Sequence, residues 1–109
     1  MKRGEIWTGA DDAQYATKPR PVVIVQNEYF ETLDSVTICR FTSDPAELPL
    51  LRVLIEPSKL NGLQFPSRIM VDKIHTMRKS RLGYRIGRLE SKDVARLDQA
   101  IATFLGLAD

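Results

Sequence analysis

The sequence predicts a mainly β protein with one C-terminal helix: a small antiparallel sheet, curled into a barrel, on which an amphipathic helix packs. Two observations support this α+β fold class. Short β-rich segments recur along the chain with turn-forming residues between them, and the hydrophobic pattern takes the helical period only after residue 90. A chain of 109 residues has room for one hydrophobic core, so we expect a single domain over residues 1–109.

Six segments are expected to form the strands. Residues 5–8 form a short first strand, and residues 20–26, which are apolar on both faces, form a buried central one. Residues 45–49 are expected to form a loop, while an Asn-Gly pair at 61–62 and residues 80–83 supply turn chemistry. The other strands are expected at residues 35–41, 52–56, 67–76 and 81–86.

The C-terminal segment predicts the helix. Ser91 can cap its start and Gly106 can end it. A short helical turn is also expected at residues 29–32. The apolar face of the C-terminal helix comprises Val94, Leu97, Ile101, Phe104 and Leu105.

Composition excludes several classes of protein. One cysteine cannot form an internal disulfide and one histidine leaves no Cys/His cluster for zinc, so we expect no metal and no cofactor. No apolar run approaches the roughly 20 residues that span a bilayer, and the amino terminus does not resemble a signal peptide. These features favour a protein of the reducing cytoplasm that has no membrane partner.

The positive charge is concentrated in one stretch. The net charge is only +2, yet residues 68–88 hold seven Lys and Arg residues against one acid, Asp72. This stretch is the electrostatic candidate for binding a polyanion. A solvated basic surface is the competing interpretation, and for any single residue it is the preferred one.

Two stretches near the amino terminus are the most informative motifs: Lys-Arg-Gly-Glu-Ile-Trp at residues 2–7 and Pro-Arg-Pro-Val-Val-Ile-Val-Gln at residues 19–26. Arg20 stands between two prolines at the start of an apolar strand. Each proline fixes its own φ, and Pro21 also pushes Arg20 toward an extended conformation, so the guanidinium leaves the strand's edge at a defined angle. This arrangement is typical of an anion-binding group.

Together the two stretches resemble the amino-terminal signature of the MazF/PemK toxin family. The likeness continues over nearly the whole chain: residues 41–44 resemble the Thr-Ser ending of the family's next strand, 71–76 its central strand, and 81–89 its approach to the final helix. The resemblance implies an SH3-like barrel of the MazF/CcdB toxin type with a C-terminal helix, used as a homodimer.

The resemblance also implies an activity. MazF-like toxins are metal-independent, sequence-selective endoribonucleases: the 2′-hydroxyl of single-stranded mRNA attacks its neighbouring phosphate and leaves a 2′,3′-cyclic phosphate and a 5′-hydroxyl. Because the substrate supplies the nucleophile, the protein need only move protons and stabilise charge. The sequence has no Gly-rich phosphate loop and no serine hydrolase elbow, and Cys39 lies among apolar neighbours as a core residue does.

Three residues match the family's catalytic positions. Arg20 could clamp the phosphate or act as an acid, although it could also bond loop carbonyls at a strand end. Thr42 could hold the attacking oxygen or a phosphate oxygen, although Thr-Ser-Asp-Pro also forms ordinary turns. Asp72 could take part in proton transfer, although pairing with nearby arginines is at least as good an interpretation.

The sequence departs from the family pattern at several points. One branch carries an arginine two residues before the aspartate, where this chain has Met70; Arg68, on the same strand face, could substitute. The loop at residues 9–19 is short and holds no histidine, which puts base preference in doubt. His75 is expected opposite Asp72 on its strand, in a structural or dimer-interface role. Of the aromatic residues, Tyr15 and Phe65 could stack bases, but none is assigned.

Further RNA contacts and a protein partner complete the prediction. The antitoxin implied by the resemblance has an acidic, disordered tail that suits the basic stretch. Two other functions stay open: a CcdB-like gyrase poison, which shares the barrel, and a non-catalytic RNA-binding barrel, which Met70 keeps in consideration. The residues expected to bind RNA are Lys18, Ser43, Arg68, Lys73 and Arg78.

Overall fold

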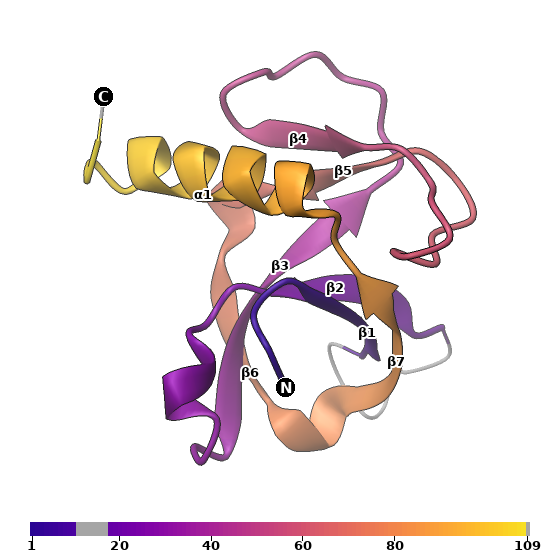
Figure 1. Ribbon diagram of the computed structural model, residues 1–109, viewed down its shortest axis with the longest axis vertical. Coiled ribbons are helices and arrows are strands. Elements are labelled where there is room, and N and C mark those ends of the chain that lie inside the picture. Colours follow the sequence, from indigo (N-terminus) through magenta and orange to yellow (C-terminus); the bar gives the residue numbers. More distant parts are fainter. Residues whose placement is uncertain (11–17, 109) are drawn as a thin grey trace.

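The protein, described here by a computed structural model for residues 1–10 and 18–108, is a curled antiparallel sheet with one α-helix packed on it (Figure 1). In the described residues the strand order is β4-β5-β3-β2-β1-β7, and β6 pairs with β3 outside this path. The helix, α1 (Ser91–Phe104), follows the last strand. The strands are β1 (Glu5–Gly9), β2 (Arg20–Ile24), β3 (Ser35–Thr42), β4 (Arg52–Ile55), β5 (Ser67–Met70), β6 (His75–Arg78) and β7 (Leu82–Arg88).

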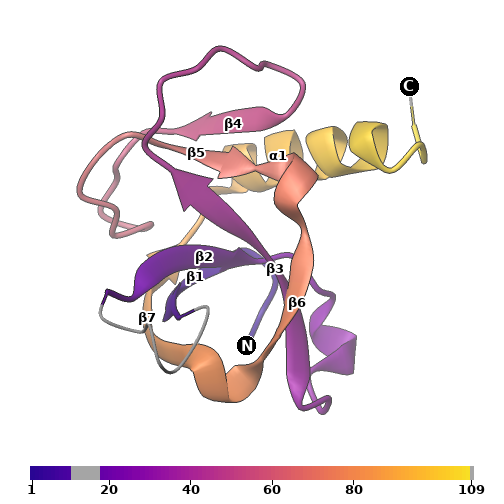
Figure 2. The same cartoon turned by 180° about the vertical axis from the view of Figure 1, so that it is seen from behind.

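The long strand β3 joins the two parts of the fold. Its first half pairs with β6 and its end pairs with β5, while β2 runs along its other edge. Figures 1 and 2 show α1 packed against β4 and β5, in front of them in one view and behind them in the other, with β1, β2, β6 and β7 curling below. The predicted small antiparallel barrel with a C-terminal helix is therefore confirmed, as a sheet that is not closed and has β4 and β7 at the two ends of its strand order.

The sheet is buried on both faces along β2. Val23 belongs to a core cluster that includes Leu97 of α1, whereas Val22 and Ile24 belong to a second cluster with Met77 of β6. All three β2 side chains are at most 1% exposed. This two-sided burial is the reason that the segment is apolar at every position rather than alternating.

The expected strand at residues 67–76 is wrong as a single element. A 3-10 turn, Val71–Lys73, separates β5 from β6. Phe41 faces Ile69 and Ile38 faces His75, so three steps along β3 correspond to six steps along the other segment. The three additional residues form the turn. This offset in register allows both β5 and β6 to hydrogen-bond to the same edge of β3.

Two smaller expectations also differ from the structure. The residue preceding α1 is Glu90, which makes no side-chain capping bond, so Ser91 begins the helix instead of capping it. The expected turn at 29–32 is a 3-10 turn at Glu28–Phe30, capped by the side chain of Asn27, which accepts a bond from the Tyr29 amide. The described part of the chain contains no helix that is both long and apolar enough to cross a membrane.

Candidate functional site

Three of the predicted site residues align in one row at an end of the sheet. Thr42, the last residue of β3, is the register partner of Arg68 on β5. On its other side, β3 pairs with β2 as far as Val22 and Arg40, and two more residues in that register put Arg20 opposite Thr42. Side chains directly opposite each other in antiparallel strands point to the same face. These three residues, at the ends of neighbouring strands, are called the Arg20–Thr42–Arg68 row.

The side chain of Arg20 is available to a ligand. Arg20 is exposed and begins β2, where its backbone pairs with Gly9 of β1. Within the part of the chain that the structure describes, its guanidinium makes no hydrogen bond or ion pair. An exposed arginine with its planar fork of donors free is suited to bind a phosphate through two parallel bonds.

The Thr42 hydroxyl is oriented by a hydrogen bond in which its oxygen is the acceptor. The Thr42 Oγ1 accepts a hydrogen bond from the backbone amide of Asp44 at 3.1 Å. Asp44 in turn accepts a bond from the Ala46 amide at 2.9 Å, so the chain turns sharply after β3. Because the hydroxyl oxygen only accepts in this turn, its hydrogen can still be donated to a substrate oxygen. The turn and the catalytic interpretations are thus compatible.

Arg68 completes the row but has a weak partner. Its guanidinium lies 3.8 Å from a carboxylate oxygen of Glu47, whose side chain is 86% exposed. An ion pair at this distance on a solvent-exposed loop contributes little to stability. Arg68, whose own side chain is 20% exposed, is thus not held by a strong ion pair.

Asp72 lies apart from the row, in an ion-paired cluster of its own. It is part of the 3-10 turn after β5, four residues beyond Arg68, which is on the order of 10 Å along the chain. Its carboxylate binds the guanidinium of Arg52 and, at 3.2 Å, the ammonium of Lys73. Burial acts to raise the pKa of Asp72, but the bonds from Arg52 and Lys73 outweigh it and hold that pKa below its ordinary value.

Arg52 is the residue that the sequence interpretation missed here. It is the register partner of Met70 on β5 and lies against Asp72 with its side chain only 15% exposed. The arginine beside Asp72 thus comes from the neighbouring strand β4, whereas Arg68 pairs with Glu47. No local signal in the sequence identifies Arg52, because its contact depends on the register between β4 and β5.

His75 and Arg40 form a second pair on the sheet. The His75 Nε2 lies 3.2 Å from a guanidinium nitrogen of Arg40, and its Nδ1 lies 3.1 Å from the carbonyl of Lys73. A guanidinium can only donate, so Nε2 accepts and Nδ1 carries the hydrogen. Burial lowers the pKa of Arg40. The strand alternation that put His75 opposite Asp72 does not apply, since Asp72 lies in a turn.

The remaining predicted RNA-binding residues are divided between two regions. Lys18 and Ser43 are exposed and adjoin the strand ends that carry Arg20 and Thr42, and Lys73 binds Asp72. Arg78 pairs with Ser35 at the other end of the eight-residue strand β3. That position is about 24 Å from Thr42 along an extended strand, so the structure does not bring Arg78 to the row. Tyr15 lies outside the described residues.

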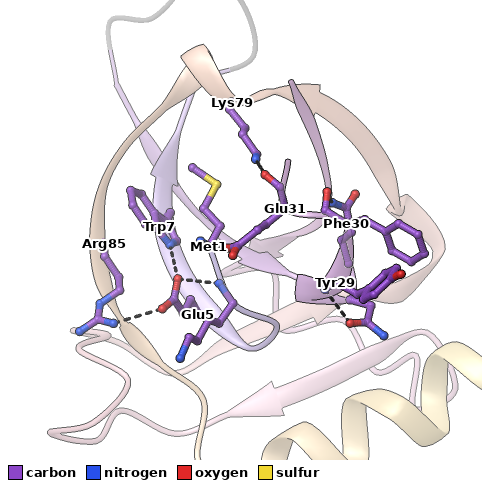
Figure 3. A network of polar contacts seen from close by, with 11 residues as sticks. Met1, Glu5, Trp7, Tyr29, Phe30, Glu31, Lys79 and Arg85 are labelled. Carbon is purple, nitrogen blue, oxygen red and sulfur yellow. Dashed lines mark hydrogen bonds and ion pairs between the residues drawn. The ribbon is translucent and has the colours of Figure 1, made fainter. Parts of the chain in front are cut away.

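The opening motif holds the fold together. The carboxylate of Glu5 accepts bonds from the Trp7 indole and the Lys2 amide, both at 3.0 Å, and from Arg85 at 3.1 Å (Figure 3). Glu5 is 9% exposed. Burial acts to raise its pKa, but these bonds outweigh it and lower the pKa below the ordinary value. We found no group of three or more His, Cys, Asp or Glu side chains placed to hold a metal ion within residues 1–10 and 18–108.

Sequence and fold are both similar to those of known proteins. Residues 2–105 match the family described as PemK-like, MazF-like toxin of type II toxin-antitoxin system. The chain is 44% identical over 108 residues to the probable endoribonuclease MazF of Mycolicibacterium smegmatis, with 99% of each sequence covered. It is 30% identical over 116 residues to endoribonuclease MazF9 of Mycobacterium tuberculosis, with 98% of each covered. A solved endoribonuclease in complex with its cognate antitoxin, from Mycobacterial species, superposes with a TM-score of 0.82 at 25% identity, covering 100% of this chain and 98% of that one.

Proposed function

The chain belongs to the family of PemK-like, MazF-like toxins of type II toxin-antitoxin systems, and on this premise we propose that it is an endoribonuclease that cuts single-stranded mRNA in the cytoplasm. The 2′-hydroxyl at the cut site attacks the adjacent phosphorus, the bond to the 5′-oxygen of the next nucleotide breaks, and a 2′,3′-cyclic phosphate and a 5′-hydroxyl remain. The attacking oxygen loses a proton and the leaving oxygen gains one, so the step balances without an oxidant, a reductant or a group from a cofactor.

The feature that supports this proposal best is the placement of Arg20 and Thr42, each two residues beyond the Val22–Arg40 pair that ends the β2–β3 ladder. Arg20 binds the scissile phosphate and stabilises the negative charge that develops on its oxygens in the phosphorane. Thr42, oriented by its bond from the Asp44 amide, holds the attacking 2′-hydroxyl by accepting its hydrogen, or donates its own hydrogen to a phosphate oxygen. Together they supply positioning and charge stabilisation from two adjacent strands.

Asp72 acts at the margin of this site. Its pKa is held below the ordinary value by Arg52 and Lys73, which makes its carboxylate a weaker base. We assign it a positioning role: it keeps two cations ordered near the path of the RNA backbone. Arg68, Lys18, Ser43 and Lys73 contribute phosphate contacts, which supply affinity without sequence information.

The protein works as a homodimer and is silenced by a cognate antitoxin. An acidic, disordered tail of the antitoxin would compete with RNA for the same cations, since both partners present negative charge along an extended chain. Residues 68–88, with seven Lys and Arg residues and one acid, offer that segment a binding surface.

A metal-free digestion tests the proposal. A long single-stranded RNA is incubated in EDTA with the wild-type protein and with Arg20→Ala and Thr42→Ala, and the new ends are mapped by primer extension. We expect discrete cuts with cyclic phosphate ends, which Arg20→Ala should form about 10²- to 10³-fold more slowly. Intact RNA from folded, dimeric wild-type protein would overturn the ribonuclease proposal, and stabilised gyrase-DNA cleavage complexes would then favour the gyrase poison.

A further inference from the structure

A pocket of about 430 Å³ opens between the β4–β5 loop and β7, beside the proposed catalytic row. Its lining includes Pro21, Leu63, Phe65, Tyr84 and Ile86. This volume lies in the range of pockets that hold small organic ligands. Nothing in the proposed chemistry of Arg20 and Thr42 accounts for it.

Two aromatic rings of the pocket are exposed to water. Phe65 is 69% exposed and Tyr84 is 68% exposed. In the described part of the chain the one contact between aromatic rings joins Tyr29 and Phe30, at 5.1 Å. Phe65 and Tyr84 thus stack on no other aromatic ring of the described residues, although burying such rings would stabilise a protein that had no other use for them.

The loop that carries Phe65 is anchored by hydrogen bonds in the residues just before that ring. Asn61 is 0% exposed, and its side chain accepts bonds from the amides of Ser58 and Leu63 and donates one to the carbonyl of Glu56. The loop also packs closely on β7, since a Cβ at Gly62 would lie 2.6 Å from the carbonyl oxygen of Ile86. A ring on such a loop loses little conformational entropy when it binds a ligand.

The pocket adjoins the catalytic row through the chain itself. Pro21 and Ser67 line it, and each is the immediate neighbour of a row residue, Arg20 and Arg68 respectively. Successive strand residues point to opposite faces, so the guanidinium groups and the pocket lie on the two sides of the same strand ends. Figures 1 and 2 agree in placing the β4–β5 loop at the end of the molecule where β2 begins and β3 ends. An RNA chain whose phosphate is bound at Arg20 can thus pass around the end of the strand and place a neighbouring base in the pocket.

Polar groups around the rings suit a nucleobase. Arg85 lines the pocket, and its guanidinium is held by Glu5 at 3.1 Å while its side chain stays 57% exposed (Figure 3). The exposed Gln64 adds an amide that both donates and accepts. Aromatic faces with a nearby arginine are the usual means by which proteins hold the bases of single-stranded nucleic acids.

We propose that this pocket seats one nucleobase next to the cleaved bond, stacked on Phe65 and Tyr84, and thereby contributes to the choice of cleavage sequence. The assignment rests on the proposed ribonuclease function. It gives the exposed rings a role that follows from their position beside two phosphate-binding arginines.

Binding, measured apart from cleavage, tests the subsite. Fluorescence anisotropy follows an RNA oligonucleotide with a 2′-deoxy sugar at the cut site, which binds but is not cut. Stacking of one base is worth about 1–3 kcal/mol, so Phe65→Ala and Tyr84→Ala should each weaken binding by roughly 5- to 150-fold. Phe65→Trp should retain it. Tyr29→Ala, which removes an 81% exposed ring from another part of the surface, is the matched control and should leave binding unchanged.

An abasic nucleotide locates the base. The oligonucleotide is made with an abasic site at each position near the cut in turn. At one position the abasic site should weaken binding to wild-type protein as much as Phe65→Ala weakens binding to the intact oligonucleotide. When the abasic site at that position is combined with Phe65→Ala, the two losses of binding free energy should not add, because each change removes the same stacking contact. On long RNA the variants should cut with a raised KM and a broader set of sequences.

The outcomes separate the two proposals. Wild-type protein that cuts RNA while the Phe65 and Tyr84 variants match it in affinity and cleavage pattern would overturn the subsite and leave the ribonuclease standing. Wild-type protein that neither binds nor cuts RNA would overturn both. Variants that keep RNA affinity but lose an acidic antitoxin peptide would overturn the subsite in favour of a protein-docking role. Thermal unfolding of each variant confirms that it is folded.

Discussion

The guanidinium of Arg52 binds the carboxylate of Asp72, so the cation beside this aspartate reaches it from strand β4 and not from the aspartate's own segment. The two side chains are 15% and 18% exposed, and Arg52 also donates to the carbonyl of Leu51 at 3.0 Å. The pair links β4 to the turn after β5. Its first consequence is for stability, because either partner alone would leave a largely buried charge without its counterpart.

We therefore predict that Arg52→Gln and Asp72→Asn each lower the free energy of unfolding by about 1–3 kcal/mol, and that the double variant loses less than their sum. Urea denaturation of the four proteins measures this coupling. Lys73→Ala is the control and should cost under about 1 kcal/mol, because its side chain is 58% exposed. An Asp72→Asn protein of unchanged stability that cuts RNA 100-fold more slowly would instead indicate a catalytic base.

Stability should fall in acid in a way that depends on Glu5. The pKa of Glu5 is lowered in the folded state, so its contribution is present above the ordinary value of about 4.3 and is lost as the pH falls through the folded pKa. Asp72, whose pKa is also lowered, adds a contribution with the same sign. We expect urea unfolding between pH 7 and pH 3 to show a steep loss for wild-type protein and a shallower one for Glu5→Gln.

Glu5→Gln should also be less stable than wild type at pH 7, by about 1.5–3 kcal/mol, because it weakens bonds to the Trp7 indole and Arg85. Glu28→Gln, which changes an exposed carboxylate, is the control and should leave the slope with pH unchanged. Equal slopes for wild type and Glu5→Gln would contradict the assignment of the acid sensitivity to Glu5.

Removal of the Arg20 guanidinium should abolish most cleavage and spare the fold. The Arg20 guanidinium has no partner in the described residues, so Arg20→Ala breaks no bond there. We expect kcat/KM to fall about 10²- to 10³-fold, because the charge of the transition state loses its stabilisation. Arg20→Lys keeps the positive charge without the planar guanidinium, and its kcat/KM should lie between those of the wild type and Arg20→Ala. Arg78→Ala, at the other end of β3, is the matched control and should stay within about threefold of wild type. A similar loss from both substitutions would place the chemistry elsewhere.

Thr42 should need its hydroxyl and not its methyl group. Thr42→Ser keeps the oxygen that accepts from the Asp44 amide and should cut RNA at nearly the wild-type rate. Thr42→Val has the same shape without the hydroxyl, and we expect kcat to drop about 10²-fold with a small loss of stability. Single-turnover cleavage at saturating protein isolates this step. Equal rates for the serine and valine variants would show that Thr42 only ends the strand.

Gly87 should be the least replaceable glycine of the pocket region. A Cβ there would lie 2.4 Å from the carbonyl oxygen of Leu60, which accepts a bond from the Arg88 amide at 3.0 Å. We predict that Gly87→Ala costs about 3 kcal/mol or prevents folding. Gly106→Ala meets no atom within 4 Å and bears only the strain of its φ of +76°, so thermal unfolding should show a cost near 1 kcal/mol. A stable Gly87→Ala protein would mean that the β4–β5 loop can move away from β7.

Parts of the site were predictable because local chemistry governs them. Two prolines set the backbone on either side of Arg20, and a Thr-Ser-Asp sequence forms a turn whatever it adjoins, so both residues were placed at strand ends. The expectation for His75 rested on a premise that the structure does not meet. Its predicted face assumed an unbroken strand, and the turn Val71–Lys73 interrupts that alternation.

Local residue patterns were enough to predict the β-rich segments, a central strand apolar on both faces and one amphipathic helix. They were also enough to predict an extended backbone at Arg20, between two prolines. The tertiary structure alone decided which strands lie side by side and in what register. It thereby brought Arg52 to Asp72, Arg85 to Glu5, and the β4–β5 loop to β7. Side-chain period and proline geometry depend on a few adjacent residues. Strand register depends on many contacts between distant segments, so the register cannot be predicted from a local stretch of sequence.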